Sequence, residues 1–354
     1  MELTVNTSKP YRILIEDGCL SQIGKYASEL FPQAKRTVVV SDSNVLPLYA
    51  ERVVRSLGAA GFAAGTFEFP AGEESKRLSS IESICRSFAE NELTRSDFAV
   101  ALGGGVTGDM AGFAAAAWLR GIPFLQIPTT LLAQIDSSVG GKTGVDLPEG
   151  KNLVGAFHQP SLVLIDPETL STLPPLFFSD GMGEAVKYGC IRSRELFDRI
   201  KNTDVREDMK TMIAQCVDIK RTVVERDEFD NGERMLLNFG HTFGHALERL
   251  HGYRDLTHGA AVGIGMVMMA RMGEAWRLTE PGTSDEIAAV LRKHGLPDRD
   301  DMEIEKILDA TASDKKNRGD KISLVLLKRI GDSFLYTVPR DKFRKLAGAL
   351  ERKP

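Results

Sequence analysis

Short apolar runs alternate with helical patterns along the first half of the chain. The runs are Arg12–Ile15, Thr37–Val40, Phe62–Phe69, Phe98–Leu102, Phe124–Ile127 and Leu162–Ile165. Helical spacing of apolar residues separates several of them, as in Leu46–Leu57 and Leu78–Glu90. Alternating strands and helices are typical of βαβ units. This half therefore predicts an α/β domain with a largely parallel sheet.

The pattern changes after about residue 173, where Pro174-Pro175 interrupts the chain. Longer helical patterns follow, at Ser179–Cys190, Glu195–Lys201, Asp208–Glu225, Leu236–Leu250 and His258–Leu278. Two strand-like runs, Ile322–Lys328 and Ser333–Val338, flank a glycine and predict one late hairpin. We therefore expect an α/β plus α fold, with an α/β domain over residues 1–173 and a mostly α-helical domain over residues 174–354.

Composition and charge exclude two classes of partner. With 354 residues, of which 42% are hydrophobic and 27% charged, the chain can bury a sizeable core. The net charge of −4 argues against nucleic acid, although a small anionic substrate needs only a local cluster of cations. The longest apolar run, residues 260–270, is too short to span a bilayer, so we expect no membrane insertion.

The cysteines and the first residues favour a cytoplasmic location. The four cysteines are far apart and form no CxxC pair, as expected of free thiols in a reducing compartment. Met1–Asn6 has neither the basic nor the apolar segment of a signal peptide. We therefore expect a cytoplasmic protein.

A glycine-rich segment follows the predicted strand Phe98–Leu102. Gly103–Asp109 satisfies G-x-G-x-x-G, and a helix is predicted from Met110 to about Arg120. Such a loop lets the backbone approach a pyrophosphate, which the N–H groups and dipole of the helix then bind. The usual acid about twenty residues later is missing, but Asp42 ends another strand, where it could hold a ribose hydroxyl. The alternative is a tight turn without a ligand.

A second glycine segment, Gly140-Gly141-Lys142-Thr143, resembles part of an ATP-binding loop. That motif needs a glycine at position 136, where this chain has Asp136. We therefore reject an ATP loop. Lys142 can still reach a phosphate as a point charge.

Four of the six histidines fall within eighteen residues: His241, His245, His251 and His258. His241 and His245 are four residues apart, which puts both imidazoles on one face of a helix. His258 could return to the same point from a short loop. Imidazole is the commonest metal ligand, so the cluster predicts a metal site that still lacks a carboxylate. The alternative is a set of core or capping histidines.

Several segments, in this order along nearly the whole chain, resemble the 3-dehydroquinate synthase family. They are Pro70–Lys76, Gly103–Asp109, Arg120-Gly121, Gln126–Ala133, Asp136–Thr143, Lys151-Asn152, Gly183–Lys187, Asn238–His245 and Asp314–Asn317. The resemblance implies a Rossmann-like NAD-binding domain followed by an α-helical metal and substrate domain, which agrees with the organisation predicted above.

The resemblance also implies ligand sets. Glu184, His241 and His258 would bind Zn²⁺, with Co²⁺ also suited to such ligands, while His245 would lie near the substrate. Contacts to NAD are implied for Glu73, Lys76, Gly104, Gly105, Val106, Thr107, Gly108, Asp109, Thr129, Thr130, Lys142, Lys151, Thr169, Leu170, Ser171 and Thr172. Asp42 is added from its position after a strand.

The implied substrate is a seven-carbon sugar acid phosphate, 3-deoxy-D-arabino-heptulosonate 7-phosphate. Its carboxylate and phosphate require cations and hydrogen-bonding partners. The substrate-binding candidates are Arg120, Lys151, Asn152, Lys187, Lys220, Arg234, Asn238 and Lys316, and the catalytic candidates are His245, Lys142, Asp136 and Lys187. Arg120 matches a family arginine that reaches the neighbouring subunit's site, so the resemblance implies a homodimer.

The implied reaction is a redox cycle without net consumption of NAD. A ring carbinol is oxidised, phosphate leaves by β-elimination, the hydride returns, the ring opens, and an intramolecular aldol step closes the carbocycle. Three alternatives remain open: another sugar phosphate cyclase, a metal-dependent polyol dehydrogenase, and a non-catalytic NAD or metal sensor.

Overall fold

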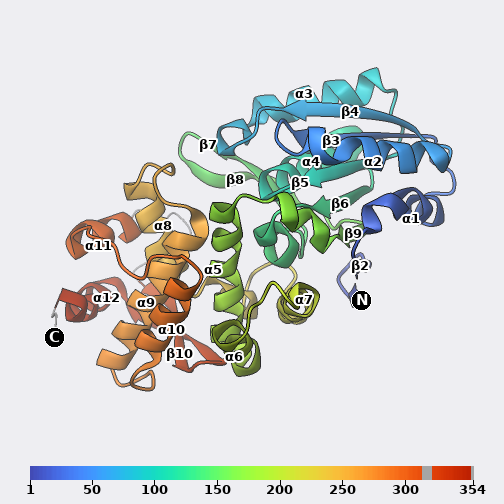
Figure 1. Ribbon diagram of the computed structural model, residues 1–354. Helices are drawn as coiled ribbons and strands as arrows, with labels where there is room; N and C mark the ends of the chain where they lie inside the picture. Colours follow the sequence, from blue (N-terminus) through green and yellow to red (C-terminus); the bar gives the residue numbers. More distant parts are fainter. Residues whose placement is uncertain (313–320, 352–354) are drawn as a thin grey trace. The chain divides into compact units, whose positions relative to one another are not determined.

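A computed structural model describes residues 1–312 and 321–351 of the chain. The chain divides into two units, Met1–Pro174 and Pro175–Pro354 (Figure 1). The first unit is built around a sheet and the second around helices. The assignment of cofactor binding to one and of metal and substrate binding to the other stays a prediction.

The first unit contains a seven-stranded sheet in the order β1-β2-β9-β6-β5-β3-β4. Only β1 and β2 pair antiparallel, and the other neighbours are parallel. The predicted parallel sheet is therefore correct, with β1 as an additional edge strand. The strands are β1 (Glu2–Val5), β2 (Tyr11–Ile15), β3 (Arg36–Asp42), β4 (Ala63–Phe69), β5 (Phe98–Gly103), β6 (Phe124–Pro128) and β9 (Leu162–Ile165).

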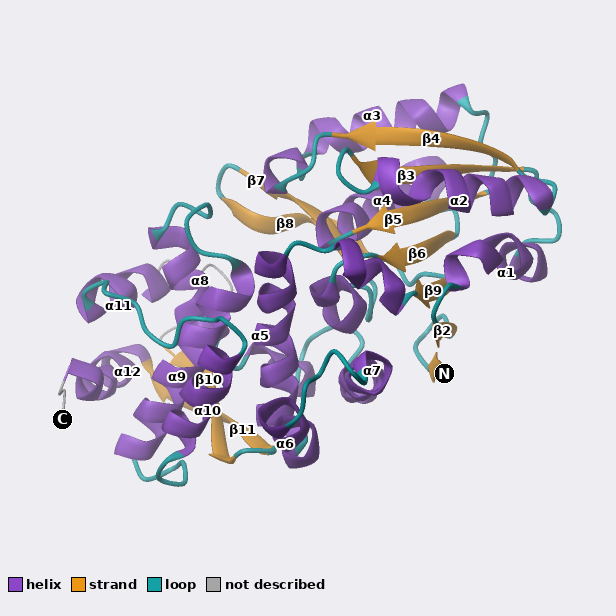
Figure 2. Cartoon of the chain, in the orientation of Figure 1, coloured by secondary structure: helices purple, strands orange, loops and turns teal. Residues whose placement is uncertain are grey.

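Helices cover both faces of this sheet (Figure 2). Val39 of β3 and Val100 of β5 pack in one core with α1 (Ile23–Leu30) and α2 (Leu46–Ala59). Their neighbours Val38 and Ala99 face the opposite core, with α3 (Leu78–Glu90) and α4 (Gly105–Ala117). Successive strand residues point to opposite faces, so a strand buried on both sides reads as a continuous apolar run. This is why the sequence shows runs rather than alternation.

One hairpin of the first unit was not predicted. β7 (Lys142–Leu147) and β8 (Gly150–Phe157) pair antiparallel outside the main sheet. Several short helical turns complete this unit: η1 (Cys19–Gln22), η2 (Glu73–Ser75), η3 (Trp118–Arg120), η4 (Ala133–Ser137) and η5 (Pro167–Thr172). Of these, η4 is a single π-helical turn.

The second unit is mostly helical. Its helices are α5 (Pro175–Arg192), α6 (Arg194–Asn202), α7 (Met209–Arg226), α8 (His241–Leu250), α9 (His258–Ala275), α10 (Thr283–Lys293), α11 (Ile304–Ala312) and α12 (Arg340–Ala347), with the turns η6 (Glu233–Asn238) and η7 (Gly348–Glu351). The predicted hairpin is present as β10 (Lys321–Arg329) and β11 (Asp332–Pro339). Helix α9 is buried almost all round, because α5, α8 and α10 pack against it. None of the described helices combines the length and hydropathy needed to cross a membrane.

Two helices begin at other residues than the sequence predicted. The helix predicted over Leu236–Leu250 is wrong before Gly240, where a left-handed backbone with φ 82° separates η6 from α8. A side chain at Gly240 would also lie 2.6 Å from the Val262 carbonyl oxygen, so the close approach of α9 requires glycine. In the first unit, α4 begins at Gly105 rather than at Met110. The glycine loop is therefore shorter than predicted, and its later glycines belong to the helix.

Candidate functional site

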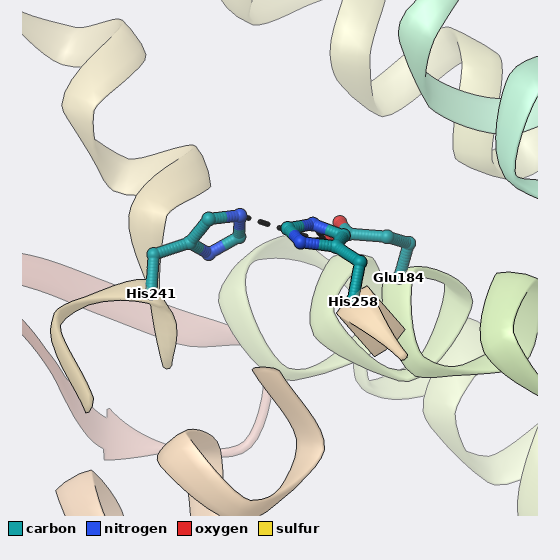
Figure 3. A group of neighbouring side chains, drawn as sticks. All are labelled: Glu184, His241 and His258. Atoms are coloured by element: carbon teal, nitrogen blue, oxygen red, sulfur yellow. Dashed lines mark ion pairs between the residues drawn. The ribbon is translucent and has the colours of Figure 1, made fainter. Parts of the chain in front are cut away.

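Three side chains from different helices of the second unit converge on one point (Figure 3). Glu184 lies on α5, while His241 and His258 are the first residues of α8 and α9. The Nε2 atoms of His241 and His258 lie 3.6 and 3.3 Å from Glu184 Oε1. One ligand atom from each residue lies within 4.8 Å of the others. Ligands of tetrahedral Zn²⁺ are about 3.3 Å apart, so a small adjustment would let these three hold an ion.

A close contact between α5 and α9 brings Glu184 to His258. A Cβ on Gly259 would lie 1.9 Å from the Asp180 carbonyl oxygen, so only glycine allows this approach. The Asp180 carboxylate also accepts a hydrogen bond from Gly259 N at 2.5 Å, at the first turn of α9. Asp180 lies one turn before Glu184 on α5, and its bond to Gly259 holds the start of α9 at that place. The sequence places these residues far apart, and the helix contact joins them.

The two histidines have opposite proton affinities in this site. Burial opposes charge on His258, but Glu184 and Glu248 outweigh it and raise the pKa of His258 to about 10. Burial and the Lys187 ammonium hold the pKa of His241 well below its ordinary value. Metals bind neutral imidazole, so a metal must displace a proton from His258 but not from His241.

Both imidazoles are also held at their far nitrogen. His241 Nδ1 lies 3.2 Å from the Phe239 carbonyl oxygen, and His258 Nδ1 lies 3.4 Å from Glu248 Oε1. Their Nε2 atoms are left to face Glu184. This arrangement suits a metal site, because the group at the far nitrogen sets which ring nitrogen is free to bind the ion.

Two further predicted residues lie beside this group. Lys187 forms an ion pair with Glu184 Oε2, and the two side chains are 2% and 0% exposed. The His245 ring lies 5.2 Å from that of His241 and 6.3 Å from that of His258. His245 thus lies next to both histidines. Among the described residues, however, the group that could hold an ion consists of His241, His258 and Glu184, without His245. The geometry therefore favours the set implied by the resemblance over the His241–His245 pair.

Arg234 and Asn238 precede this group on η6. Asp227 accepts hydrogen bonds from the backbone N–H groups of Asn231, Gly232 and Arg234, which holds the loop before η6. Although burial opposes its charge, these bonds lower the pKa of Asp227. Arg234 is 2% exposed and donates from Nη1 to the Glu228 carbonyl at 2.5 Å.

The remaining substrate candidates of the second unit are less closely defined. Lys220 is buried on α7, which packs against η6, and Asn238 is exposed at the end of η6. Lys316 lies outside the described residues. Its predicted role therefore stays a prediction.

In the first unit, the predicted cofactor loop joins β5 to α4. Gly104 precedes the helix, and Gly105, Val106, Thr107, Gly108 and Asp109 form its first turns. The free N–H groups and dipole of this end can bind an anion. Thr107 Oγ1 lies 3.3 Å from Asp42 Oδ2, so the two predicted residues are neighbours. Asp42 also accepts hydrogen bonds from Asn44 N and Val45 N.

A polar cluster connects α4 with η2 and the β7–β8 hairpin. Lys76 Nζ lies 2.6 Å from both Asp109 Oδ2 and Asn152 Oδ1. Burial opposes the charge of Lys76, but Asp109 and then Glu73 raise its pKa. Lys151 Nζ lies 3.7 Å from Glu73 Oε1. The structure thus brings Asn152, predicted for the substrate, to residues predicted for the cofactor.

Other predicted residues of the first unit lie on separate turns. Thr129 and Thr130 follow β6, Asp136 lies on η4, and Lys142 is exposed at the start of β7. The buried hydroxyl of Thr129 has no hydrogen-bond partner among the described residues. Arg120 is exposed, with a left-handed backbone at φ 68°.

The predicted cofactor segment Thr169–Thr172 lies on η5. Tyr49 OH donates to the Thr169 carbonyl at 3.1 Å and lies 2.5 Å from Thr172 Oγ1. Thr169, Ser171 and Thr172 line a cavity of about 260 Å³, and both Thr169 and Leu170 are buried. Tyr49 thus holds this segment beside a small cavity.

We call Glu184, His241 and His258 the metal group. Sequence reasoning missed two acids near it, Glu248 and Asp180. Glu248 lies seven residues after His241, and therefore on the same face of a helix. That spacing is a signal that could have found it. Asp180 has a weaker signal, four residues before Glu184.

The chain matches two family models in succession. One is described as 3-dehydroquinate synthase N-terminal, over residues 66–180, and the other as 3-dehydroquinate synthase C-terminal, over residues 181–317. A 3-dehydroquinate synthase of Streptococcus gordonii is 46% identical over 352 residues, which cover 98% of this chain and 99% of that protein.

Solved structures of two sugar phosphate cyclases share the fold. A 2-deoxy-scyllo-inosose synthase, complexed with carbaglucose-6-phosphate, NAD⁺ and Co²⁺, is 26% identical with a TM-score of 0.87, covering 98% of this chain and 99% of its own. The 2-epi-5-epi-valiolone synthase of Streptomyces hygroscopicus, with NAD⁺ and Zn²⁺ bound, is 26% identical with a TM-score of 0.85, covering 97% of each chain. The fold class and the enzyme class predicted from the sequence are confirmed. The chain belongs to the 3-dehydroquinate synthase family.

Proposed function

We propose that this chain converts 3-deoxy-D-arabino-heptulosonate 7-phosphate to 3-dehydroquinate and phosphate, with NAD and Zn²⁺ or Co²⁺ as cofactors. One observation carries the proposal: Glu184, His241 and His258 form a metal-ligand group in a chain 46% identical to a 3-dehydroquinate synthase. The two similar cyclases, solved with NAD⁺ and with Co²⁺ or Zn²⁺, support the choice of cofactors.

The metal would be held by Glu184, His241 and His258. A set of three protein ligands leaves a position for substrate oxygens, as catalytic metal sites require. NAD would supply a reversible hydride acceptor, and the metal would supply Lewis-acid polarisation. Lys187 keeps a cation beside the carboxylate ligand. His245, next to both ligand histidines, would transfer protons.

The substrate's carboxylate would be bound by Arg234, with Lys220 and Asn238. A guanidinium binds two carboxylate oxygens at once, and Arg234 is held by its own loop. Lys151 and Lys316 are proposed for the phosphate group, because an ammonium is a compact charge for such an anion, with Asn152 as a neutral hydrogen-bonding partner. The proposed contacts with the carboxylate would distinguish this substrate from sugar phosphates without a carboxylate.

NAD would be bound by the first unit. The start of α4 suits the pyrophosphate, with Gly104–Asp109 supplying backbone N–H groups. The contacts would be completed by Asp42 near the ribose and by Glu73, Lys76, Thr129, Thr130, Lys142, Lys151 and the segment Thr169–Thr172. Asp136 would orient a neighbouring group or a water molecule.

We also propose a cytoplasmic homodimer in which Arg120 acts at the partner's site. The left-handed backbone of Leu119 and Arg120 is unusual for these residue types and supports a functional role for this turn. The four cysteines are free thiols, in keeping with a reducing compartment. Sedimentation of the purified protein tests the dimer. Loss of activity in Arg120→Ala, restored by mixing with a variant inactive at the metal group, tests the shared site.

The experiment that tests the function is phosphate release by the metal-loaded protein with a catalytic amount of NAD. Three substrates are compared: the heptulosonate 7-phosphate, sedoheptulose 7-phosphate and glucose 6-phosphate. We expect many turnovers on the first alone, without net NADH. Turnover on either of the other two would assign the chain to a sister cyclase. NADH formed stoichiometrically without phosphate release would indicate a dehydrogenase, and binding without turnover would indicate a sensor.

A further inference from the structure

The carboxylate of Glu248 lies behind the metal group. Glu248 is on α8, is 4% exposed, and has its Oε1 atom 3.4 Å from His258 Nδ1. On the other side of the same ring, Nε2 lies 3.3 Å from the proposed ligand Glu184. The imidazole of His258 therefore stands between two carboxylates, one at each nitrogen.

The position of Glu248 follows from the helix that carries His241. Glu248 lies seven residues after His241 and three after His245, so all three share one face of α8. That face packs along α9, whose first residue is His258. A single helix thus carries one proposed ligand and the carboxylate that contacts another.

A buried carboxylate is costly unless it has a partner, and one partner of Glu248 is the far nitrogen of a proposed ligand. A carboxylate at Nδ1 holds the proton there, which leaves the lone pair of Nε2 directed at the ion. It also fixes the ring's rotation and makes Nε2 more basic. His241 receives the weaker version of this support, from the Phe239 carbonyl.

We infer that Glu248 is a positioning residue for the metal site, which orients His258 through Nδ1 and raises its affinity for the ion. The inference rests on the proposed function, because it assumes that His258 is a ligand. It assigns no contact with the substrate to Glu248. Removing the Glu248 carboxylate should therefore weaken metal binding directly, and should affect the reaction only through the loss of metal.

The test is the metal affinity of the purified full-length protein, measured by competition with a chelator for Zn²⁺. The variants are Glu248→Gln, which keeps the size and an acceptor oxygen, and Glu248→Ala. We expect Glu248→Ala to weaken Zn²⁺ binding about 10- to 100-fold, the usual effect of losing such a partner. Glu248→Gln should weaken it less, and the visible spectrum of the Co²⁺-loaded protein should change in the same order.

Glu274→Gln is the matched control. Glu274 is a half-buried carboxylate on α9 that accepts hydrogen bonds from Ser284 N and Oγ at 2.8 and 2.9 Å. We expect this variant to melt at a lower temperature but to bind Zn²⁺ like the wild type.

Two results would overturn the inference in distinguishable ways. If the wild type binds Zn²⁺ and both Glu248 variants match it within twofold, Glu248 does not position the ligand, and the proposed function stands. If the wild type binds neither Zn²⁺ nor Co²⁺, the metal assignment fails, and the role of Glu248 fails with it.

Discussion

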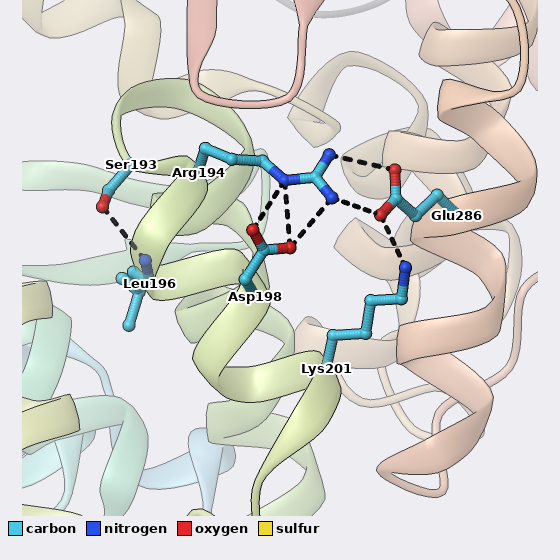
Figure 4. A network of polar contacts seen from close by, with 6 residues as sticks. All are labelled: Ser193, Arg194, Leu196, Asp198, Lys201 and Glu286. Atoms are coloured by element: carbon cyan, nitrogen blue, oxygen red, sulfur yellow. Dashed lines mark hydrogen bonds and ion pairs between the residues drawn. The ribbon is translucent and has the colours of Figure 1, made fainter.

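Two groups of ion pairs in the second unit differ chiefly in burial. At the metal group, Glu184 and Lys187 are 0% and 2% exposed. In the second group, Arg194 bonds both Asp198 and Glu286, and Lys201 bonds Glu286 as well (Figure 4). Arg194, Asp198 and Lys201 are all at least 40% exposed. We call this second group the surface network.

The comparison shows what burial does to similar charges. In water, opposite charges gain little from pairing, because solvent and salt screen them. Out of water, each charge depends on its partner, and pKa values move far enough to control proton and metal binding. The surface network ties α6 to α10, whereas the metal group shifts the pKa values of His241 and His258 in opposite directions. Four predictions test this contrast.

Glu184→Gln should have the largest effect. It removes the anionic ligand and leaves the buried ammonium of Lys187 without this carboxylate. We expect loss of bound metal and a kcat/KM lower by at least about 1000-fold, since metal catalysis contributes several kcal/mol. The free energy of unfolding should fall by about 3–5 kcal/mol. Elemental analysis, kinetics and urea denaturation measure the three quantities.

The control for this variant is Glu286→Gln in the surface network. It also removes a carboxylate that pairs with cations, but we expect normal metal content and normal kcat. Full metal occupancy in Glu184→Gln would remove Glu184 from the ligand set and with it the contrast between the two groups.

A buried and an exposed arginine give the second test. Arg234→Ala should weaken substrate binding about 10- to 150-fold, because hydrogen bonds to a charged group contribute roughly 1.5–3 kcal/mol. Zinc and NAD should bind as before, which calorimetry can show separately. Arg194→Ala, at the exposed arginine, should leave substrate affinity unchanged. Unaltered substrate affinity in Arg234→Ala would take that residue out of the site.

The third test is the pH dependence of metal binding. The pKa of His258 is raised to about 10 without metal, so this imidazole is protonated at neutral pH. Zn²⁺ must displace that proton, and its affinity should rise about tenfold per pH unit between pH 6 and 8. His241, whose pKa is lowered, is already neutral in this range and adds no slope. Calorimetry in two buffers of different ionisation enthalpy should report about one proton released.

The same shift has a consequence for the metal-free protein. A raised pKa in the folded state means that His258 contributes stability that is complete below about pH 6.5, its unfolded value, and is lost as the pH rises toward 10. Metal-free protein should therefore unfold more easily at pH 9 than at pH 6.5. A release of no protons on metal binding, together with a flat stability profile, would contradict the pairing of His258 with its carboxylates.

The fold could be predicted well where a pattern is local. Buried strands such as β5 and β6 read as apolar runs, and the change at Pro174-Pro175 marked the helical half. The β7–β8 hairpin was missed because its residues are partly exposed and rich in glycine, so that no apolar run marks it. The start of α8 was missed because Gly240 acts through contact with α9, which no local pattern shows.

The site, like the fold, could be predicted only where the signal is local in the sequence. The spacing of His241 and His245 indicated a metal site, whereas the group that could hold an ion in the structure joins His241 and His258 to Glu184. Glu184 reaches the histidines only because glycines let α5 and α9 touch, and this contact lies outside any sequence window. The family resemblance supplied Glu184 because it carries information about the three-dimensional arrangement. Asp180 and Glu248 were missed because each acts through another residue rather than through a motif, although the spacing of Glu248 from His241 was a usable signal.

The smallest effect is expected in the surface network itself. Arg194→Met removes the contacts with Asp198 and Glu286, yet exposed pairs contribute only about 0.2–1 kcal/mol each. Burial opposes the charge of Glu286, but Lys201 and Arg194 lower the pKa of this carboxyl. Glu286 therefore contributes stability above about pH 4.5, its unfolded pKa, and this contribution is lost as the pH falls further. Urea denaturation of Arg194→Met, Glu286→Gln and the double variant gives their coupling energy. We expect less than about 1 kcal/mol at low salt and nearly none in 1 M NaCl, where the screening length is about 3 Å. A salt-resistant coupling of about 3 kcal/mol would mean that exposure does not weaken this network, and burial would no longer explain the difference between the two groups.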